Sequence, residues 1–223
     1  MIALAFLLLF VSSASAWSIP ASGCSISNVV LSLPPNQTQL IAPSTPPDFI
    51  SIGVGVQNYT CGTTGTFASV GAVAELFDIS CLKPSTFEHA TDLAFNAWEN
   101  APDGLTIQKI IHSLSLLKNC GILGQHYFIP NPITGSGLSP KWDFTSASKK
   151  GHPNAFVVGA RAGGIPAPTN PGTNVDWLVL NGVQGDLATQ IFRVVTRGGQ
   201  PPTTCTAGQS ISVKYASQYC EHS

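Results

Sequence analysis

An alternating segment from Phe49 to Tyr59 is the sequence feature that most limits what this chain can fold into. Its branched apolar residues fall on one face of an extended chain, and small or polar residues fall on the other. The apolar set is Ile50, Ile52, Val54 and Val56. Because successive side chains of a strand point to opposite faces, this period of two predicts a strand with one buried face.

Further strand patterns are spread along the chain and are separated by turn residues. They cover 28–33, 67–79, 125–129, 141–144, 155–160, 175–180, 190–196 and 211–219. The chain holds 21 Gly and 17 Pro, whereas charged residues make up only 9% of it, which is typical of a turn-rich β protein. The spacing predicts a mainly β fold, either an antiparallel β-sandwich or a β-barrel.

Two segments in the middle of the chain break the β pattern. Residues 86–99 and 105–118 carry apolar side chains at helical spacing, most clearly in the second segment. Asp103-Gly104 between them is a favourable turn. We therefore expect a helical hairpin inserted between strands, spanning about residues 86–119.

The first sixteen residues predict a signal peptide. Residues 1–11 are apolar and uncharged, and the small residues Ala14-Ser15-Ala16 precede a cleavage point before Trp17. The apolar run is too short for a stable membrane-spanning helix, and no later segment is apolar for long enough to span. This predicts a single secreted β-rich domain over 17–223.

All six cysteines lie after the predicted cleavage point. An even count in a secreted chain favours disulfides, and the spacing of the cysteines does not fit a zinc site. Many connectivities remain open. We expect Cys205–Cys220 first, because this bridge would close the loop between the last two strands, and then Cys61–Cys81 and Cys24–Cys120.

Two sequons predict glycosylation in the same compartment, at Asn36 and at Asn58. Asn36 lies in a Pro-rich loop and is expected to be accessible. Asn58 stands three residues before Cys61, where the fold would shield it more.

Charge and motifs exclude several function classes. With 11 acidic and 10 basic residues, the chain lacks the positive charge that nucleic-acid partners require. Hydrolase, metalloprotease and phosphate-loop motifs are missing. The nearest approach to a dinucleotide turn, at Gly53-Val-Gly55, lacks the third glycine and lies in a strand. We therefore expect no cofactor and no metal.

The candidate catalytic residues are His126, Asp143 and Asp176. His126 and Asp143 are predicted on neighbouring strands, where a carboxylate beside an imidazole would make a general base. The alternative is that His126 is a hydrogen-bonded core residue. Carboxylates in or beside strands, including Glu75, could instead form a glycosidase pair. Aromatic residues in the strands could stack on sugars, although strand aromatics more often belong to the core.

Several ordered blocks resemble one known family. They include Gly55-Val-Gln-Asn-Tyr-Thr-Cys61, Gly124-Gln-His-Tyr-Phe128, the run from Ile191 to Cys205, and Val213-Lys-Tyr-Ala-Ser-Gln-Tyr219. From Cys24 to Cys220 the chain resembles the domain-of-unknown-function 3455 family, which consists of secreted proteins found largely in fungi. Members are often labelled malate dehydrogenase automatically, a label that the missing phosphate-binding turn does not support. The resemblance implies a compartment and a fold but no catalytic residues.

These observations lead to two hypotheses. The first is a non-enzymatic extracellular binding protein whose partner is a cell-wall glycan or a surface protein, including a protein of a host. The alternative is an extracellular hydrolase that uses His126 and Asp143. A malate dehydrogenase-like oxidoreductase is disfavoured.

Overall fold

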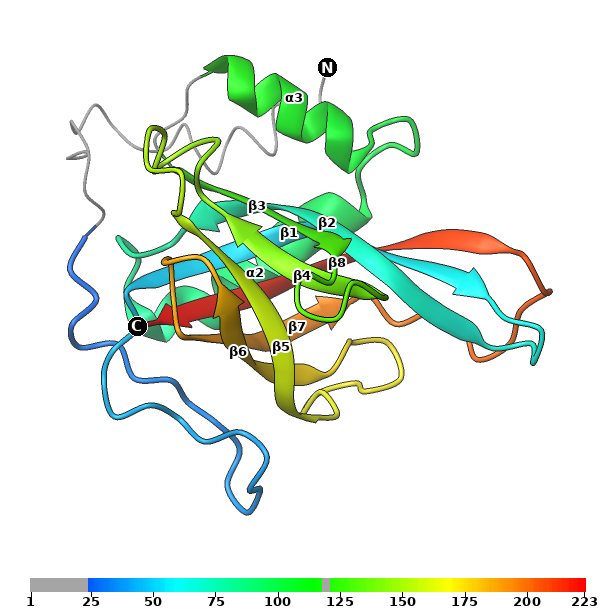
Figure 1. Cartoon of the computed structure of the whole chain (residues 1–223), viewed down its shortest axis with the longest axis horizontal. Coiled ribbons are helices and arrows are strands. Elements are labelled where there is room, and N and C mark those ends of the chain that lie inside the picture. Colours follow the sequence, from blue (N-terminus) through cyan, green and yellow to red (C-terminus); the bar gives the residue numbers. More distant parts are fainter. Residues whose placement is uncertain (1–23, 118–120) are drawn as a thin grey trace.

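The computed structural model describes residues 24–117 and 121–223 and shows a closed, antiparallel, eight-stranded barrel with helices on its outside (Figure 1). The mainly β prediction is confirmed, and the barrel is the correct one of the two architectures. The strands are β1 (Phe49–Cys61), β2 (Phe67–Asp78), β3 (Ile122–Pro130), β4 (Leu138–Asp143), β5 (Phe156–Ile165), β6 (Trp177–Gln184), β7 (Gln190–Gly198) and β8 (Ser210–His222).

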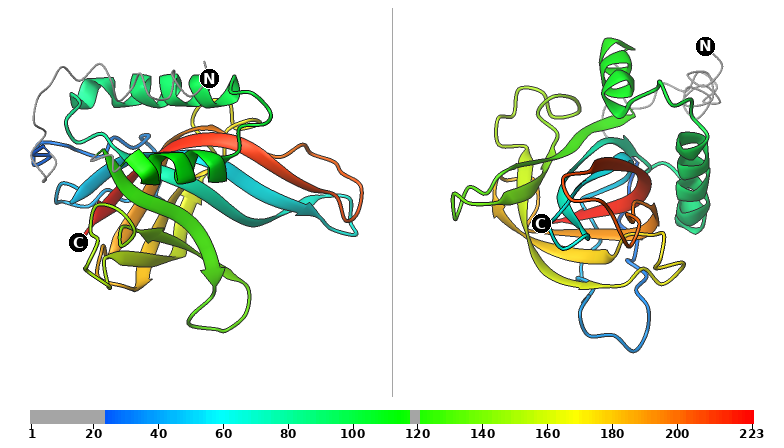
Figure 2. Two further views of the ribbon diagram at one scale, coloured as in Figure 1. Left: turned by 90° about the horizontal axis from the view of Figure 1, so that it is seen from above. Right: turned by 90° about the vertical axis from the view of Figure 1, so that its right-hand side faces the viewer.

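The barrel closes because β1 pairs with both of its neighbours over nearly its whole length. Its partners are β2 on one side and β8 on the other. All other strands pair with the next strand in the chain. Connections therefore alternate between the two ends of the barrel, whose closed ring is visible in the right-hand view of Figure 2. The residues before β1, the β4–β5 loop and the β6–β7 turn all meet at one end.

The inside of the barrel is filled by side chains rather than empty. We call this set the lumen cluster; it consists of Ala74, Leu76, Leu123, Trp142, Phe144, Val157, Leu180, Leu187, Ala188, Ile191, Tyr215 and Tyr219. Small residues on β1 leave room for the aromatic rings. A Cβ added to Gly53 would lie only 2.5 Å from Cε2 of Tyr219. The lumen is therefore packed, like the interior of other small barrels.

The apolar face of β1 points away from the lumen, which corrects the expectation of a strand with one buried face. Ile50, Ile52, Val54 and Val56 pack in an outer cluster with residues of the helices, while Ser51 and Gly53 face inward. Both faces of the strand are therefore buried. The alternation in the sequence identified the strand. It did not indicate that helices cover the apolar face or that the other face lines the lumen.

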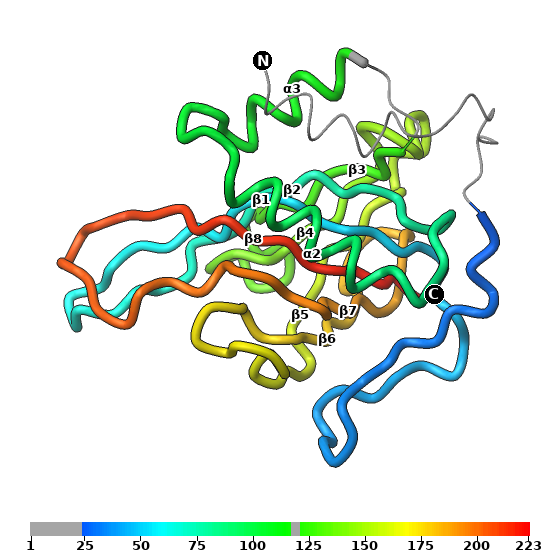
Figure 3. Tube along the Cα trace, turned by 180° about the vertical axis from the view of Figure 1, so that it is seen from behind, coloured from blue at the N-terminus to red at the C-terminus, as the bar shows by residue number. Residues whose placement is uncertain are grey.

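The helical insertion was predicted correctly. It contains a short 3-10 helix, η1 (Pro84–Thr86), followed by α2 (Phe87–Glu99) and α3 (Ile107–Leu117). Helix α2 lies across the outside of β7, β8 and β1 (Figure 3), where the Trp98 indole N–H donates to the carbonyl oxygen of Gly55 at 2.6 Å. Helix α3 contacts β2. Residues 28–33 are not a strand as predicted; they form a loop, and Val29 packs in the outer cluster.

The predicted disulfide pairings are wrong. The structure pairs Cys24 with Cys81 and Cys61 with Cys205, while Cys220 is a buried free thiol. Cys205 precedes β8 and Cys220 lies near its end, so ten residues of extended strand, about 33 Å, hold them apart. Likewise, β2 separates Cys61 from Cys81. Cys120 lies outside the described residues.

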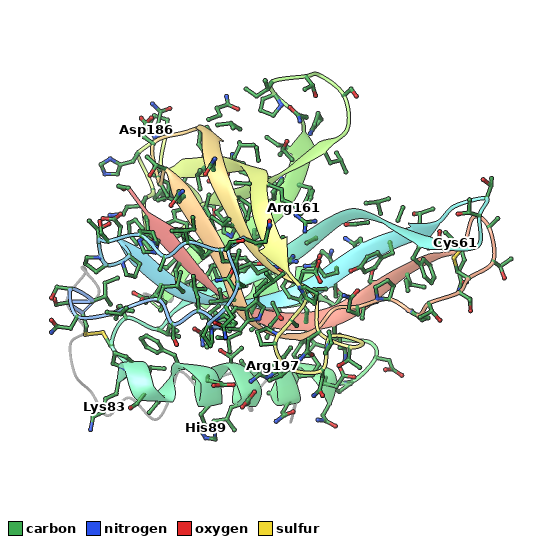
Figure 4. All side chains as sticks on the ribbon, turned by 90° about the horizontal axis from the view of Figure 1, so that it is seen from below. Cys61, Lys83, His89, Arg161, Asp186 and Arg197 are labelled. Carbon is green, nitrogen blue, oxygen red and sulfur yellow. A yellow bond between two sulfur atoms is a disulfide. The ribbon has the colours of Figure 1, made fainter. Side chains whose placement is uncertain are left out.

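The Cys61–Cys205 bridge staples an arm that projects from the barrel. Strands β1, β2 and β8 run on beyond the other strands to form it, and Cys61 marks its far part in Figure 4. The predicted signal peptide, residues 1–16, lies outside the described residues. In the two described ranges, no helix has both the length and the hydropathy needed to cross a membrane.

Candidate functional site

His126 is a core residue. It lies on β3 opposite Trp142, its ring stacks on the indole with centroids 4.4 Å apart, and its Nδ1 is 2.9 Å from the carbonyl oxygen of Lys141. Only 2% of the residue is exposed. Burial lowers the pKa of His126 to about 3, so the imidazole is neutral at ordinary pH. The core alternative for this residue is therefore correct.

Asp143 points to the other side of the sheet. It pairs with Gln125, the neighbour of His126, so the two side chains leave the strands in opposite directions. Its carboxylate lies 2.7 Å from Nζ of Lys141 and accepts hydrogen bonds from Tyr127 and Thr145. Burial would raise the pKa of Asp143, but these partners outweigh burial and hold it at about 2. The hypothesis of a His126/Asp143 general-base pair is wrong.

Asp176 lies elsewhere, just before β6. Its carboxylate is 3.9 Å from the guanidinium of Arg161, and its backbone carbonyl oxygen accepts two hydrogen bonds from Arg193. The side chain is 40% exposed. The structure therefore brings no two of the three predicted catalytic residues together.

Glu75 and Asp143 flank Gln125 in a polar row across β2, β3 and β4. Gln125 donates to the Glu75 carboxyl at 3.1 Å, and burial raises the pKa of Glu75 to about 7. Carboxyls with pKa values moved in opposite directions are typical of acid–base pairs. However, Glu75 is only 1% exposed and Asp143 only 6%, which leaves no room for a substrate. We assign this row to the structure of the barrel wall.

The strongest candidate site is a hollow of about 650 Å³ at the end of the barrel where β6 turns into β7. A volume of this size is within the range of small-molecule sites. We call it the end hollow. Its lining consists of Asp48, Phe49, Lys149, His152, Pro153, Asn154, Ala155, Asp186, Leu187 and Ser223.

Backbone hydrogen bonds hold the walls of the end hollow together. The Asp186 N–H donates to the carbonyl oxygen of Asn154, and the Asp48 N–H donates to that of Glu221. The first bond ties the β6–β7 turn to the β4–β5 loop, and the second ties the start of β1 to the end of β8. The Thr189 N–H, which donates to the carbonyl oxygen of His222, ties the end of β8 to the β6–β7 turn. The hollow is built on strand ends rather than on a single loose loop, so its lining is positioned before any ligand arrives.

The lining combines polar groups with an apolar floor. The ring of Phe49 packs edge-on against Phe144 in the lumen, and Nζ of Lys149 lies 5.3 Å from the centre of the Phe49 ring. Exposed carboxylates from Asp48 and Asp186 accept hydrogen bonds, whereas Lys149 donates them. Mixed donors and acceptors around an aromatic ring suit an uncharged ligand with many hydroxyl groups.

Sequence reasoning missed these residues because none belongs to a motif. Asp48, His152 and Asp186 are separated by long stretches of chain and lie outside the strands. The signal that would have found them is topological. In a barrel whose neighbouring strands are all antiparallel, the segments that precede β1 and β5 and follow β6 must meet at one end.

The predicted glycosylation sites differ in their surroundings. Asn36 is exposed in a turn, whereas Asn58 lies on β1 and accepts a hydrogen bond from Ser212 at 2.7 Å. Modification of either residue stays a prediction. Throughout residues 24–117 and 121–223, no three His, Cys, Asp or Glu side chains are grouped in a way that would hold a metal ion.

Comparison with known proteins gives one match. The model of a family described as "Protein of unknown function (DUF3455)" matches residues 42–221, which is most of the chain. No curated protein and no solved structure matches the chain.

Proposed function

Because the chain belongs to the DUF3455 family, whose description leaves the function open, we propose a function from the end hollow: the protein is a non-enzymatic, extracellular binding protein for a cell-wall glycan. The observation that carries the proposal is the end hollow itself, which gathers exposed carboxylates, an ammonium group and an amide around an aromatic ring. A glycan fits this lining better than a surface protein does, because the hollow is concave and combines polar groups with an aromatic ring.

The chemistry of the lining favours binding over catalysis. Glycoside hydrolysis requires one carboxyl that is kept protonated near neutral pH beside one that is ionised. The carboxyl groups with raised pKa values, Glu75 and Glu221, are buried and are not part of the hollow's lining. Exposed Asp48 and Asp186 instead serve as acceptors for hydroxyl groups.

The proposed location outside the cell rests on the disulfides and on the first sixteen residues. The two disulfides are compatible with an oxidising compartment. We expect the secreted protein to begin at Trp17 and to carry glycan at Asn36. N-terminal sequencing and glycopeptide mass spectrometry of protein recovered from culture medium would check both points.

The binding proposal is tested with three insoluble polymers, namely β-glucan, chitin and cellulose, followed by calorimetry with soluble oligosaccharides of the polymer that is retained. We expect one polymer to retain the protein. The double variant Asp186→Ala/Asn154→Ala should bind the oligosaccharide at least about tenfold more weakly, as expected when two hydrogen-bonding side chains are lost.

The matched control is Asp103→Ala, which removes an exposed aspartate between α2 and α3 and should leave the affinity unchanged. Failure of all three polymers to retain the protein would contradict the glycan proposal. Equal affinity of the double variant and the wild type would place the binding surface elsewhere and would remove the end hollow from the proposal.

A further inference from the structure

Arg193 is a cation inside the barrel that has no carboxylate partner. It lies on β7 between Phe192 and Val194, which pack in the outer cluster, so its own side chain points into the lumen. There it faces Tyr219 of β8. Its Nε and Nη2 donate to the backbone carbonyl oxygen of Asp176 at 3.1 and 2.9 Å. Among the described residues, no carboxylate lies within ion-pair distance of it.

Arg197, four residues further along the same strand, shows the usual arrangement. Its guanidinium lies 2.8 Å from a carboxylate oxygen of Glu88 and 2.5 Å from one of Asp92, both on α2. Figure 4 shows Arg197 beside that helix, on the outside of the barrel. Partly buried cations are normally neutralised in this way, because the loss of water leaves a charge in need of a partner. The unpaired state of Arg193 therefore needs an explanation.

Other polar groups of the lumen also lack hydrogen-bond partners in the described residues, and an amide and an indole are among them. The Nε2 of Gln57 and the Nε1 of Trp142 are fully buried, and neither meets the geometric criteria for a hydrogen bond. As whole residues, Gln57 is 4% exposed and Trp142 is 2% exposed. The Gln57 amide lies beside the Tyr215 hydroxyl and favours its ionised form, as a weak hydrogen bond would. The hydroxyl groups of Tyr215 and Tyr219 are 3.0 Å apart. Buried donors without protein acceptors are rare, so these groups are candidates for contact with a ligand.

The mouth of this region carries a second guanidinium. Arg161 pairs with Leu180 of the lumen cluster, so its side chain starts on the lumen face, and it is 61% exposed. Asp176 lies 3.9 Å from it. Two guanidinium groups and one carboxylate leave one net positive charge at the mouth. Figure 4 shows Arg161 well away from Asp186 and the end hollow.

We propose that the mouth of the lumen, at Arg161 and Arg193, is a binding site for a small oxyanion, meaning a phosphate or a carboxylate group. A guanidinium presents parallel N–H donors that match two oxygen atoms of such a group. The Gln57 amide on β1, beside Tyr215, is a further donor near these groups. Water could satisfy the amide, but it would leave the charge of Arg193 uncompensated. This site is independent of the end hollow and of the glycan proposal.

The probes for this site are inorganic phosphate and acetate, titrated separately at constant ionic strength with chloride as the balancing anion. We expect saturable binding of at least one of them below about 10 mM, which is the range of a weak specific site. Tighter binding of phosphate identifies a phosphate site, and tighter binding of acetate identifies a carboxylate site. Absence of saturable binding by both anions would overturn the proposal.

The decisive variants are Arg193→Gln and Arg197→Gln, which remove the same group from the same strand. The first should weaken anion binding at least about tenfold, and the second should change it less than about twofold. Equal weakening by both would mean that only long-range charge matters and would overturn the assignment.

A measurement on the wild type keeps the test valid if Arg193→Gln does not fold. The Nε–H resonance of Arg193 should shift on addition of the bound anion, while that of Arg197 should stay in place. Arg197→Gln and Arg161→Gln together assign the three arginine Nε–H resonances of the chain. If the Arg193 resonance does not move while the anion binds, the proposed site is wrong.

Discussion

Polar side chains are exposed in the end hollow but are buried, wholly or in part, in the lumen of the barrel. At the end hollow, carboxylates from Asp48 and Asp186 are exposed to solvent. In the lumen, by contrast, Arg193 and Gln57 lie near tyrosine side chains, and several buried polar atoms have no partner. The end hollow is an open surface with exposed carboxylates, of which Asp48 also accepts a hydrogen bond from the Ser223 N–H at 2.7 Å. The lumen is a packed interior with groups that protein alone does not satisfy.

The difference shows where stability and binding are separable. Exposed groups at the end hollow cost little when the protein folds, so they can be replaced with little effect on stability. Buried groups in the lumen carry a desolvation cost, so each replacement there changes the free energy of unfolding. Four predictions follow this contrast, from the largest expected effect to the smallest.

The largest effect is expected from the buried carboxyl of Glu221. This residue is fully buried opposite Phe49 and Ile191, its carboxyl oxygens have no partner, and burial raises its pKa to about 8. A raised pKa means that the folded chain holds the proton more tightly, so its stabilising effect is present at low pH and is lost as the pH rises through 8. Relative to that of Glu221→Gln, the free energy of unfolding of the wild type should fall by about 4 kcal/mol between pH 4.5 and 8.5.

Denaturant unfolding at several pH values checks this prediction. Asp186→Asn, which removes an exposed carboxylate from the end hollow, is the matched control for the loss of a carboxyl group. A wild type and Glu221→Gln variant with parallel pH profiles would show that Glu221 is not the buried proton-binding group described above.

The second effect comes from the space inside the lumen. In Gly53→Ala, the new Cβ would collide with the ring of Tyr219, which is fully buried and cannot move aside without breaking its hydrogen bond to Tyr215. We expect this substitution to lower the free energy of unfolding by about 3 kcal/mol. Gly172→Ala adds the same atom where nothing lies within 4 Å, and thermal unfolding should show almost no change. Equal melting temperatures of the two variants would mean that the lumen is looser than described.

The third effect concerns His126. Its pKa is lowered to about 3 by burial, so the unfolded chain takes up a proton before the folded chain does. The stability that it contributes is therefore present above pH 6.5 and is lost as the pH falls towards 3. The glutamine of His126→Gln does not titrate. Relative to that variant, the free energy of unfolding of the wild type should fall by about 2–3 kcal/mol between pH 6.5 and 4.5. An imidazole that titrates near pH 6.5 by NMR would contradict this account.

The smallest effect on stability is expected at the end hollow. Asp186→Asn and Asp48→Asn should each move the melting temperature by no more than about 1–2 °C, because both carboxylates are exposed. Calorimetric scans would measure this. A shift as large as that of Gly53→Ala would mean that the end hollow is part of the stabilising core. It would contradict the claim that the exposed groups of the end hollow contribute little to stability.

Strand positions followed from the sequence because alternation and turn residues are local signals. All eight barrel strands overlap the predicted segments, and both helices fall within a residue or two of the predicted bounds. The direction of each face was harder to predict. Ile52 and Val54 looked like a core face, yet they pack under helices while Gly53 faces the lumen. Which face of a strand lines the lumen depends on the curvature of the whole sheet, and no local sequence pattern indicates that curvature.

Long-range pairings were beyond the sequence for the same reason. Cys61 and Cys205 are 144 positions apart and meet only because β8 returns beside β1. His126 and Asp143 lie on adjacent strands as predicted, but a register offset of one residue sends them to opposite faces. The lining residues of the end hollow lie near strand ends, and barrel topology alone brings them together.

The most direct test of the contrast between the end hollow and the lumen is a pair of NMR titrations on uniformly ¹⁵N-labelled protein, one with the oligosaccharide of the retained polymer and one with the oxyanion that binds. The account predicts that the glycan shifts the backbone amides of Asn154 and Asp186 but not that of Arg193. The oxyanion should shift Arg193 and Tyr219 but not Asp186. Both ligands shifting one common set of residues, or neither producing a saturable shift, would contradict the claim of two separate sites in one barrel.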